Sequence, residues 1–247
     1  MGVHIYRFFG NKKDDHTWEI AGNEINHANN VLRIEPGEII EVCDGQGSWA
    51  VGSVDNVSQK EVIVRVTKNN FEARIANPIR LYIGVLRSAS IDDLLPGLVE
   101  AGIDEIFVFF QEGTNRGIVS NKILDRWERI IKNSVKQCKR AWMPSISAFE
   151  NIEKSLEKTR VENTSCYCLC QDGARSILDL SLDSRPISMV VGSEKGLDAF
   201  ELELLRKYKF NMITIGAVTM KATTSALVAT AVMNMKRMKR TGELSSQ

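Results

Sequence analysis

The chain has 247 residues, of which 43% are hydrophobic and 26% are charged, so it is long enough for two modest domains with packed cores. With 32 basic and 31 acidic residues the net charge is only +1, and a nucleic-acid partner would therefore need a local basic surface. No apolar run in the sequence approaches the roughly 20 residues that span a bilayer, and the N-terminus lacks a signal-peptide pattern. We therefore expect a cytoplasmic protein without a membrane role.

The first 70 residues predict a small β-barrel. Four short apolar or alternating segments are typical of strands, at 3–9, 38–43, 49–57 and 61–68. The run Asp44-Gly45-Gln46-Gly47 has the composition of a tight turn. A polar stretch with a proline follows at 69–78. The domain boundary is expected there, with a first domain at 1–70 and a second at 71–247.

Predicted strands and helices alternate through the second domain. The strands are expected at 79–86, 105–110, 166–171, 187–191 and 212–215. The helices are expected at 91–101, 121–142, 148–160, 198–207 and 224–240. This alternation favours a mostly parallel sheet with helices on both faces, so the predicted fold class is α/β, preceded by a small β-domain.

The five cysteines do not suggest a disulfide framework, because their number is odd and no secretion signal is evident. Three of them alternate in Cys166-Tyr167-Cys168-Leu169-Cys170, so a strand would place these three on one face. A zinc ribbon needs C-x-x-C, which the run does not provide. We interpret them as small buried hydrophobic residues on a covered strand, and we predict no metal site.

Two glycine loops at the ends of predicted strands are the best candidates for a ligand site. In the first, Val191 ends a strand, Gly192-Ser193-Glu194-Lys195-Gly196 forms a turn, and Asp198 with Glu201 has the capping-box spacing for the next helix. Ligands of open α/β sheets bind at the carboxyl ends of strands, where glycine lets the backbone approach closely. A tight turn that needs a positive φ accounts for the same glycines, so this loop alone leaves both interpretations open.

The second loop follows the next predicted strand. Ile215-Gly216 leaves that strand, and Met220-Lys221-Ala222-Thr223-Thr224-Ser225 enters a helix. The helix dipole disfavours a cation at a helix start, so Lys221 either faces solvent or serves an anionic partner. We expect the two loops to follow adjacent strands and to share a pocket. Neither contains G-x-G-x-x-G or G-x-x-x-x-G-K-[ST], the fingerprints that an unrelated nucleotide-dependent α/β enzyme would need.

The predicted helix at 121–142 carries an unequal charge. Its seven cations recur at steps of three or four residues: Lys122, Arg126, Arg129, Lys132, Lys136, Lys139 and Arg140. Only Asp125 and Glu128 oppose them in sign. Such a face is either solvated or in contact with phosphates, and the sequence alone leaves both possibilities open.

Together these features resemble one family, the RsmE-type methyltransferases of 16S ribosomal RNA, which belong to the SPOUT superfamily. The N-terminal segments similar to its H-V-L-R, G-D-E and D-G-Q-G runs are His27, Asn30-Val31-Leu32-Arg33, Pro36-Gly37-Glu38 and Asp44-Gly45-Gln46-Gly47. The middle segments are Glu100-Ala101-Gly102-Ile103-Asp104-Glu105-Ile106, Arg126-Trp127, and Gln137-Cys138-Lys139-Arg140 with Pro144. The two glycine loops stand where the family has G-P-E-G-G, L-G and L-R-T-E-T-A. The resemblance runs nearly end to end.

The resemblance implies a PUA-like β-barrel that docks RNA, then a SPOUT methyltransferase domain with a C-terminal trefoil knot, in a homodimer. It implies S-adenosylmethionine as cofactor and N3 of a uridine in 16S rRNA of the small ribosomal subunit as the target. The implied cofactor contacts are Val191, Gly192, Ser193, Gly196, Ile215, Gly216, Met220 and Thr224. The implied RNA contacts are Arg33, Arg126, Arg129, Lys136 and Arg140.

Catalysis is assigned to two residues on the same basis. Lys221, at the position of the family's arginine, is expected to stabilise the negative charge that spreads over the uridine carbonyl oxygens when N3 loses its proton. Glu194 is expected to accept that proton or to contact the cofactor.

The sequence departs from the family pattern at several positions. Pro96-Gly97 replaces a Gln-Lys pair, and Asn133 stands where an acidic residue is usual. In the two loops the departures are Ser193, Lys195, Lys221 and Thr223. Lysine and arginine are not equivalent, because only arginine offers a planar fork of donors. An alternative is therefore a degenerate SPOUT-family protein that binds RNA without methylating it.

Overall fold

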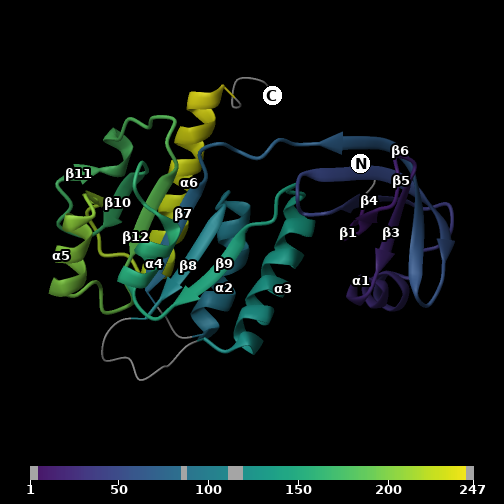
Figure 1. Ribbon diagram of the computed structural model, residues 1–247, viewed down its shortest axis with the longest axis horizontal. Helices are drawn as coiled ribbons and strands as arrows, with labels where there is room; N and C mark the ends of the chain where they lie inside the picture. The colour runs from purple at the N-terminus through teal and green to yellow at the C-terminus, as the bar shows by residue number, and fades with distance from the viewer. Residues whose placement is uncertain (1–4, 85–87, 111–118, 243–247) are drawn as a thin grey trace. The chain divides into compact units, whose positions relative to one another are not determined.

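The computed structural model describes residues 5–84, 88–110 and 119–242 and divides the chain into two compact units (Figure 1). The first unit comprises Met1–Arg74 together with Lys132–Met143, and the second comprises Ile75–Ile131 together with Pro144–Gln247. The N-terminal part therefore ends close to the expected boundary at residue 70. The segment 132–143, which returns to the first unit, has no counterpart in the expected division.

The first unit contains a six-stranded sheet with the order β1-β4-β5-β6-β3-β2. Its strands are β1 (Arg7–Phe9), β2 (Asn11–Lys12), β3 (Thr17–Ala21), β4 (Ile39–Cys43), β5 (Ser48–Val57) and β6 (Glu61–Phe71). Only β1 and β4 pair in parallel. The strands expected at 38–43, 49–57 and 61–68 are confirmed, and the one expected at 3–9 is present as β1, with residues 3 and 4 outside the described residues.

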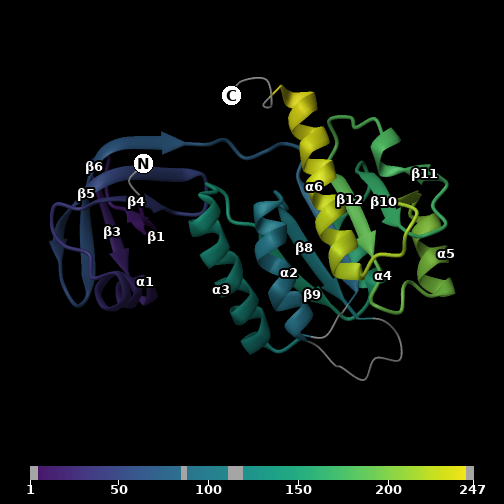
Figure 2. The same ribbon diagram turned by 180° about the vertical axis from the view of Figure 1, so that it is seen from behind.

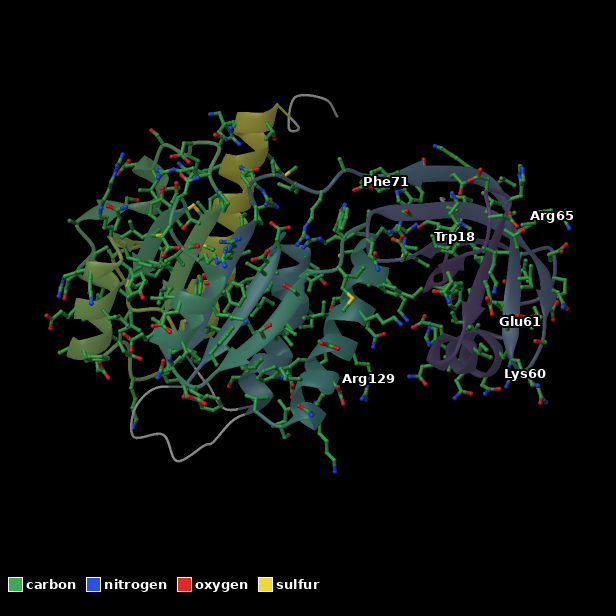
Figure 3. The ribbon with its side chains drawn as sticks, viewed as in Figure 1. Trp18, Lys60, Glu61, Arg65, Phe71 and Arg129 are labelled. Carbon is green, nitrogen blue, oxygen red and sulfur yellow. The ribbon has the colours of Figure 1, made fainter. Side chains whose placement is uncertain are left out.

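The sequence-based prediction missed β2 and β3, and it missed the helical stretch formed by α1 (Asn23–Asn26) and the π-helix η1 (His27–Leu32). In β3 the buried side chains alternate, so Trp18 and Ile20 point into the core while their neighbours do not. Trp18 lies opposite Val64 of β6, whereas Arg65 points outward from the same strand (Figure 3). A strand of five residues carries too little periodicity to be recognised alone.

The second unit contains a seven-stranded, fully parallel sheet with the order β11-β13-β10-β12-β7-β8-β9. Its strands are β7 (Ile79–Gly84), β8 (Glu105–Phe109), β9 (Ser145–Phe149), β10 (Ser165–Leu169), β11 (Arg175–Ser176), β12 (Ile187–Val191) and β13 (Asn211–Thr214). A short 3₁₀ helix, η2 (Ile177–Asp179), follows β11. The expected parallel sheet is thus confirmed, but the expectation that the two glycine loops follow adjacent strands is wrong, because β10 lies between β12 and β13.

Helices cover both faces of this sheet. The helices of the chain beyond α1 are α2 (Ser88–Glu100), α3 (Asn121–Cys138), α4 (Ile152–Thr159), α5 (Ala199–Lys207) and α6 (Ala222–Thr241). Helices α4 and α5 share one core with Tyr82 and Phe107 of the sheet (Figure 1). On the opposite face, α6 packs against α2, β7 and β12 (Figure 2). Among the described residues, no helix combines the length and the apolar character needed to cross a membrane.

Two expected helices have different bounds. Helix α3 ends at Cys138 rather than at 142, because Lys139 adopts a left-handed conformation with φ 57°. The helix expected at 148–160 is present as the shorter α4, because residues 148 and 149 are the last two residues of β9. The side chain of Asn151 accepts a hydrogen bond from the Lys154 amide, so this N-cap fixes the start of α4 after the strand.

Candidate active site

Both glycine loops and the end of β10 line one cavity of about 920 Å³ in the second unit. All ten residues that the sequence assigned to the cofactor or to catalysis line it: Val191, Gly192, Ser193, Glu194, Gly196, Ile215, Gly216, Met220, Lys221 and Thr224. The loops meet because β10, β12 and β13 are parallel neighbours whose carboxyl ends lie at the same edge of the sheet. The expected shared pocket is therefore present, with β10 between its two loops.

The first loop is a tight turn whose glycines are required by its own packing. A Cβ on Gly192 would lie 2.6 Å from the backbone carbon of Gly196, and a Cβ on Gly84 would lie 2.6 Å from the Ser193 nitrogen. Gly196 has φ 78° and donates its amide to the Ser193 carbonyl at 2.9 Å. Close packing at Gly84 and Gly192 and the positive φ of Gly196 account for these glycines without a ligand, while the turn still forms one wall of the cavity.

The first loop is anchored by the capping box that begins α5. The Asp198 carboxylate accepts from the Glu201 amide at 2.8 Å, and the Glu201 carboxylate accepts from the Asp198 amide at 2.9 Å. These two bonds satisfy two backbone donors at the helix start. The capping box expected from the sequence is confirmed, and it fixes where the loop ends.

The second loop has open space next to Gly216. The only described atom within 4 Å of a Cβ built on Gly216 is the methyl carbon of Met220, at 3.5 Å, which is ordinary contact. Gly216 does not have a positive φ. The Thr214 hydroxyl donates to the Gly216 carbonyl at 3.0 Å and thereby fixes the backbone at this point. Neither sterics nor backbone strain requires glycine here, which leaves space for a ligand over the backbone.

The two charged candidates are exposed on the cavity wall. Lys221 occupies the N-cap position of α6, so the expectation of a lysine at a helix start is confirmed. Within the described part of the chain, neither the Lys221 ammonium nor the Glu194 carboxylate has an ion-pair partner. The cavity lining thus mixes apolar side chains with many polar ones, which fits a small-molecule cofactor of mixed polarity.

A family model described as an RNA methyltransferase domain matches residues 73–234, well over half of the chain. The chain belongs to this family. A second model, described as an RNA methyltransferase PUA domain, matches residues 20–67 in the first unit.

Relatives that share one name match nearly the whole length of the chain. The ribosomal RNA small subunit methyltransferase E of Mesomycoplasma hyopneumoniae is 26% identical over 225 residues, which is 90% of this chain and 96% of that protein. Its namesake from Bacillus subtilis is 24% identical over 237 residues, with 88% and 90% covered. The Neisseria gonorrhoeae enzyme of this name, solved bound to S-adenosyl methionine, superimposes with a TM-score of 0.84 at 23% identity, covering 94% of this chain and 98% of that one. This likeness confirms the expected SPOUT-type α/β fold behind a PUA-like barrel.

In this RNA methyltransferase, carboxylates from distant parts of the sequence pair with much of the basic face of α3. In the second unit, Arg126 lies 2.6 Å from the Asp92 carboxylate, which also accepts a hydrogen bond from the Trp127 indole at 3.1 Å. In this chain, Asp92 of α2 therefore binds both residues of the Arg126-Trp127 pair. The Arg126 side chain remains 62% exposed.

The other half of α3 belongs to the first unit, where two glutamates neutralise its lysines. Lys132 and Lys136 lie 3.6 Å and 3.0 Å from the Glu24 carboxylate. Lys139, which directly follows α3, lies 3.0 Å from the Glu41 carboxylate. The excess of cations on the predicted helix is thus largely balanced within the fold, and a phosphate partner is not needed to explain it.

Two of the predicted RNA contacts are exposed arginines whose positive charge is not paired with a carboxylate among the described residues. Arg129 is exposed on α3 (Figure 3), and Arg33 is exposed at the end of η1. Neither has an ion-pair partner among the described residues. Lys136, in contrast, already lies 3.0 Å from the Glu24 carboxylate, and Arg126 lies 2.6 Å from Asp92. The five candidates therefore differ in how much of their charge is available to a partner.

The Asp44–Gly47 turn has a structural role that its composition did not reveal. The Gly47 amide donates to the Ala141 carbonyl, and the Met143 amide donates to the Gly45 carbonyl. A Cβ on Gly47 would lie 2.8 Å from the Trp142 ring. Within the first unit, the turn therefore binds the end of the segment 132–143. The contacting positions are almost 100 residues apart in the sequence, so no local pattern predicts this contact.

Sequence reasoning also missed part of the cavity wall. Leu169 at the end of β10 and the next two residues, Cys170 and Gln171, line the cavity, and α2 contributes Ser90, Asp93 and Gly97. The cysteine run was interpreted as buried, which is confirmed for Cys166 and Cys168 but not for Cys170, which is only half-buried. These residues could be assigned to the cavity wall only from the order of the strands in the sheet, and the sequence alone does not give that order.

Proposed function

We propose that the chain is an S-adenosylmethionine-dependent methyltransferase that acts on N3 of a uridine in the 16S rRNA of the small ribosomal subunit. The observation that carries the proposal is the convergence of both glycine loops on one cavity. Membership of the RNA methyltransferase family supports the reaction, and the names of the relatives support the ribosomal target. The cofactor bound to the Neisseria enzyme supports the methyl donor.

The volume and the lining of the cavity are suitable for this cofactor. The cavity has the volume of a small-molecule site, and its lining of mixed polarity suits a cofactor that has both polar and apolar parts. Gly216 leaves the backbone of the second loop open to a ligand, and Val191 with Ile215 offers apolar surface. In this proposal the adenosine and methionine parts lie along the two loops, where the backbone provides most of the polar contacts.

When bound, S-adenosylmethionine supplies a methyl group on a sulfonium sulfur, which an in-line nucleophile accepts. The protein has to orient N3 of the uridine toward it and to remove the N3 proton. Glu194 is the proposed proton acceptor, since its exposed carboxylate lines the cavity without an ion-pair partner among the described residues. The Lys221 ammonium is the proposed electrostatic stabiliser of the charge on the uridine carbonyl oxygens.

RNA binding is proposed for Arg33, Arg126, Arg129, Lys136 and Arg140 with unequal weight. Arg33 and Arg129 carry exposed charges without ion-pair partners among the described residues, so they are the first candidates for phosphate contact. Lys136 would have to share its charge with Glu24. An Arg129→Ala variant should weaken binding to small subunits and reduce its salt dependence, whereas Arg240→Ala at the end of α6 serves as the control.

A cytoplasmic homodimer is the proposed form of the enzyme, together with the C-terminal knot of its family. The support is apolar surface beside the cavity: Val218 is 71% exposed and Leu227 on α6 is 37% exposed. A second copy would cover both side chains. Light scattering should give twice the chain mass, and Leu227→Asp should shift the protein toward monomer. A monomeric wild-type protein would contradict this assembly.

The decisive experiment compares 16S rRNA from cells with and without the gene by mass spectrometry. Loss of one methyluridine without the gene, restored by the wild-type gene, is the expected result. Calorimetry with S-adenosylmethionine on the purified chain tests the cofactor separately. No binding together with intact binding to small subunits would favour the alternative, a degenerate relative that binds RNA without methylating it.

A further inference from the structure

Cys170 lies at the end of β10, between the two glycine loops, and lines the cavity. Its amide donates to the Ile213 carbonyl of β13 at 3.0 Å, so its backbone is held in the sheet. The residue, which directly follows the last residue of the strand, is half-buried, whereas Cys168 within β10 is fully buried. Cys170 is therefore a half-buried cysteine in the cavity wall whose backbone position is fixed, although the proposed function assigns it no role.

Cys168 and Cys170 lie two residues apart, so in an extended segment their side chains lie on the same side, where the Cys168 thiol is placed to donate a hydrogen bond to the Cys170 sulfur. This bond and burial both raise the pKa of Cys168 far above its ordinary value, so the proton stays on the buried sulfur. The same bond, donated to the more open sulfur, lowers the pKa of Cys170 to about 7. Arg206 acts in the same direction, while burial and Asp172 act against it. A substantial fraction of Cys170 is then thiolate, the nucleophilic form, at neutral pH.

We propose that Cys170 is a modification site in the cofactor cavity, and that an adduct on its sulfur excludes the cofactor. This inference rests on the proposed function, which places S-adenosylmethionine in that cavity. Its ligands are soft electrophiles and peroxides, because thiolates react with both. The adduct would project into the space between the glycine loops, so modification and cofactor binding compete.

The chemistry balances without any further reactant. With iodoacetamide, the sulfur forms a bond to carbon, the carbon–iodine bond breaks and iodide leaves. With hydrogen peroxide, the thiolate attacks one oxygen and the O–O bond breaks. Sulfur is oxidised to the sulfenic acid, and the second oxygen leaves as hydroxide.

The first test labels the native, full-length protein with iodoacetamide and follows each cysteine by peptide mass spectrometry. Cys170 should be labelled at least about tenfold faster than the buried Cys43, Cys166 and Cys168, since only a thiolate that reagent can reach reacts. Its rate should be half-maximal near pH 7, and saturating S-adenosylmethionine should slow it severalfold. Labelling of Cys170 no faster than that of Cys168 would overturn the proposal.

The second test measures cofactor affinity by calorimetry before and after treatment with iodoacetamide or hydrogen peroxide. Treated wild-type protein should lose most of its affinity. The Cys170→Ser variant should keep, after treatment, whatever affinity it had before. An equal loss in the variant would overturn the proposal, because the sensitive group would then lie elsewhere.

The Cys168→Ala variant separates thiol activation from simple exposure. Removing the donated hydrogen bond should move the half-maximal labelling pH of Cys170 upward by about one unit or more. An unchanged pH profile would remove the role of Cys168. Failure of the proposed function looks different, because untreated protein would then bind no S-adenosylmethionine while Cys170 was still labelled rapidly.

Discussion

The Lys136 ammonium lies 3.0 Å from the Glu24 carboxylate, although the two residues are 112 positions apart in the sequence. Both side chains are nearly buried, at 12% and 10% exposed, and Lys132 adds a second cation at 3.6 Å from the same carboxylate. Within the first unit, this cluster joins the second half of α3 to the helical stretch that contains Glu24. A charge expected to contact RNA is thus used, at least in part, to build the fold.

Removing the carboxylate from this cluster should destabilise the protein. Glu24→Gln leaves two lysines beside a neutral group, and breaking a buried ion pair from one side costs about 3 kcal/mol. Urea denaturation followed by fluorescence measures the loss. The double variant Glu24→Gln, Lys136→Met should recover part of it, because it no longer buries that unpaired charge.

The matched control is Lys12→Ala, which breaks the exposed pair between Lys12 and Asp15. Exposed pairs contribute at most about 1 kcal/mol, so this variant should stay close to the wild type. If Glu24→Gln is as mild as Lys12→Ala, the Glu24 cluster does not hold this part of the first unit together.

Glu41 should make stability depend on acid pH. Burial raises the pKa of Glu41, but hydrogen bonds and charges from Lys139 and Arg7 outweigh burial and hold that pKa below its ordinary value. A carboxyl that ionises more easily when folded stabilises the fold above its unfolded pKa, and this contribution is lost as the pH falls through the folded pKa. The difference in melting temperature between wild type and Glu41→Gln should therefore be largest at neutral pH and shrink toward about pH 3.

Thermal unfolding between pH 7 and pH 3 measures this difference. Glu203→Gln, which alters an exposed carboxylate on α5, should follow the wild-type curve throughout. A gap between wild type and Glu41→Gln that stays constant with pH would show that the loss comes from packing rather than from the charge.

The sequence predicted features whose cause is local. The capping box of Asp198 and Glu201 needs only a spacing of three residues, so its position could be inferred directly. The buried strands of the second unit are continuous apolar runs, which is typical of parallel sheets. The family resemblance supplied the roles of the loop residues, which periodicity could not.

Features that depend on distant partners were not predictable. The pairing of Glu24 with Lys136 and the contact of Gly47 with Trp142 join segments that only the folded chain brings together. The place of Cys170 in the cavity wall follows from β10 lying between β12 and β13, and strand order is not encoded in any local pattern. The seven cations of the helix predicted at 121–142 were ambiguous for the same reason.

The two loop glycines should respond differently to an added methyl group. Gly192→Ala places a Cβ 2.6 Å from the backbone of Gly196, so the first loop must shift, and both stability and cofactor affinity should fall. Gly216→Ala meets only the end of the Met220 side chain at 3.5 Å, so the fold should be unaffected. If a ligand lies over Gly216, its affinity should nevertheless fall, by about tenfold for a contact worth about 1.4 kcal/mol.

Melting temperature and calorimetry with S-adenosylmethionine distinguish these effects. Gly216→Ala should separate them, with an unchanged melting temperature and weaker binding, whereas Gly192→Ala should change both. Full affinity in Gly216→Ala would mean that the cofactor does not approach the second loop at this point.

Lys221→Ala should abolish methylation while leaving the fold intact. The side chain is exposed and makes no capping hydrogen bond at the start of α6, so its removal costs the fold little. The substitution also removes the ammonium proposed to stabilise the uridine anion in the transition state. Loss of one such group typically slows a reaction by about 100-fold or more. Lys221→Arg should retain part of the rate, since the positive charge is kept in a different shape.

Methyl transfer to small subunits, followed with radiolabelled S-adenosylmethionine, measures these rates alongside the melting temperature. Lys239→Ala is the matched control, because it removes an exposed lysine from the last turn of the same helix, away from the cavity lining. It should methylate at the wild-type rate. Wild-type activity in Lys221→Ala would show that this lysine has no catalytic role. Among the described residues no other cation lines the cavity, so methyl transfer would then proceed without electrostatic stabilisation by a cation of the cavity wall.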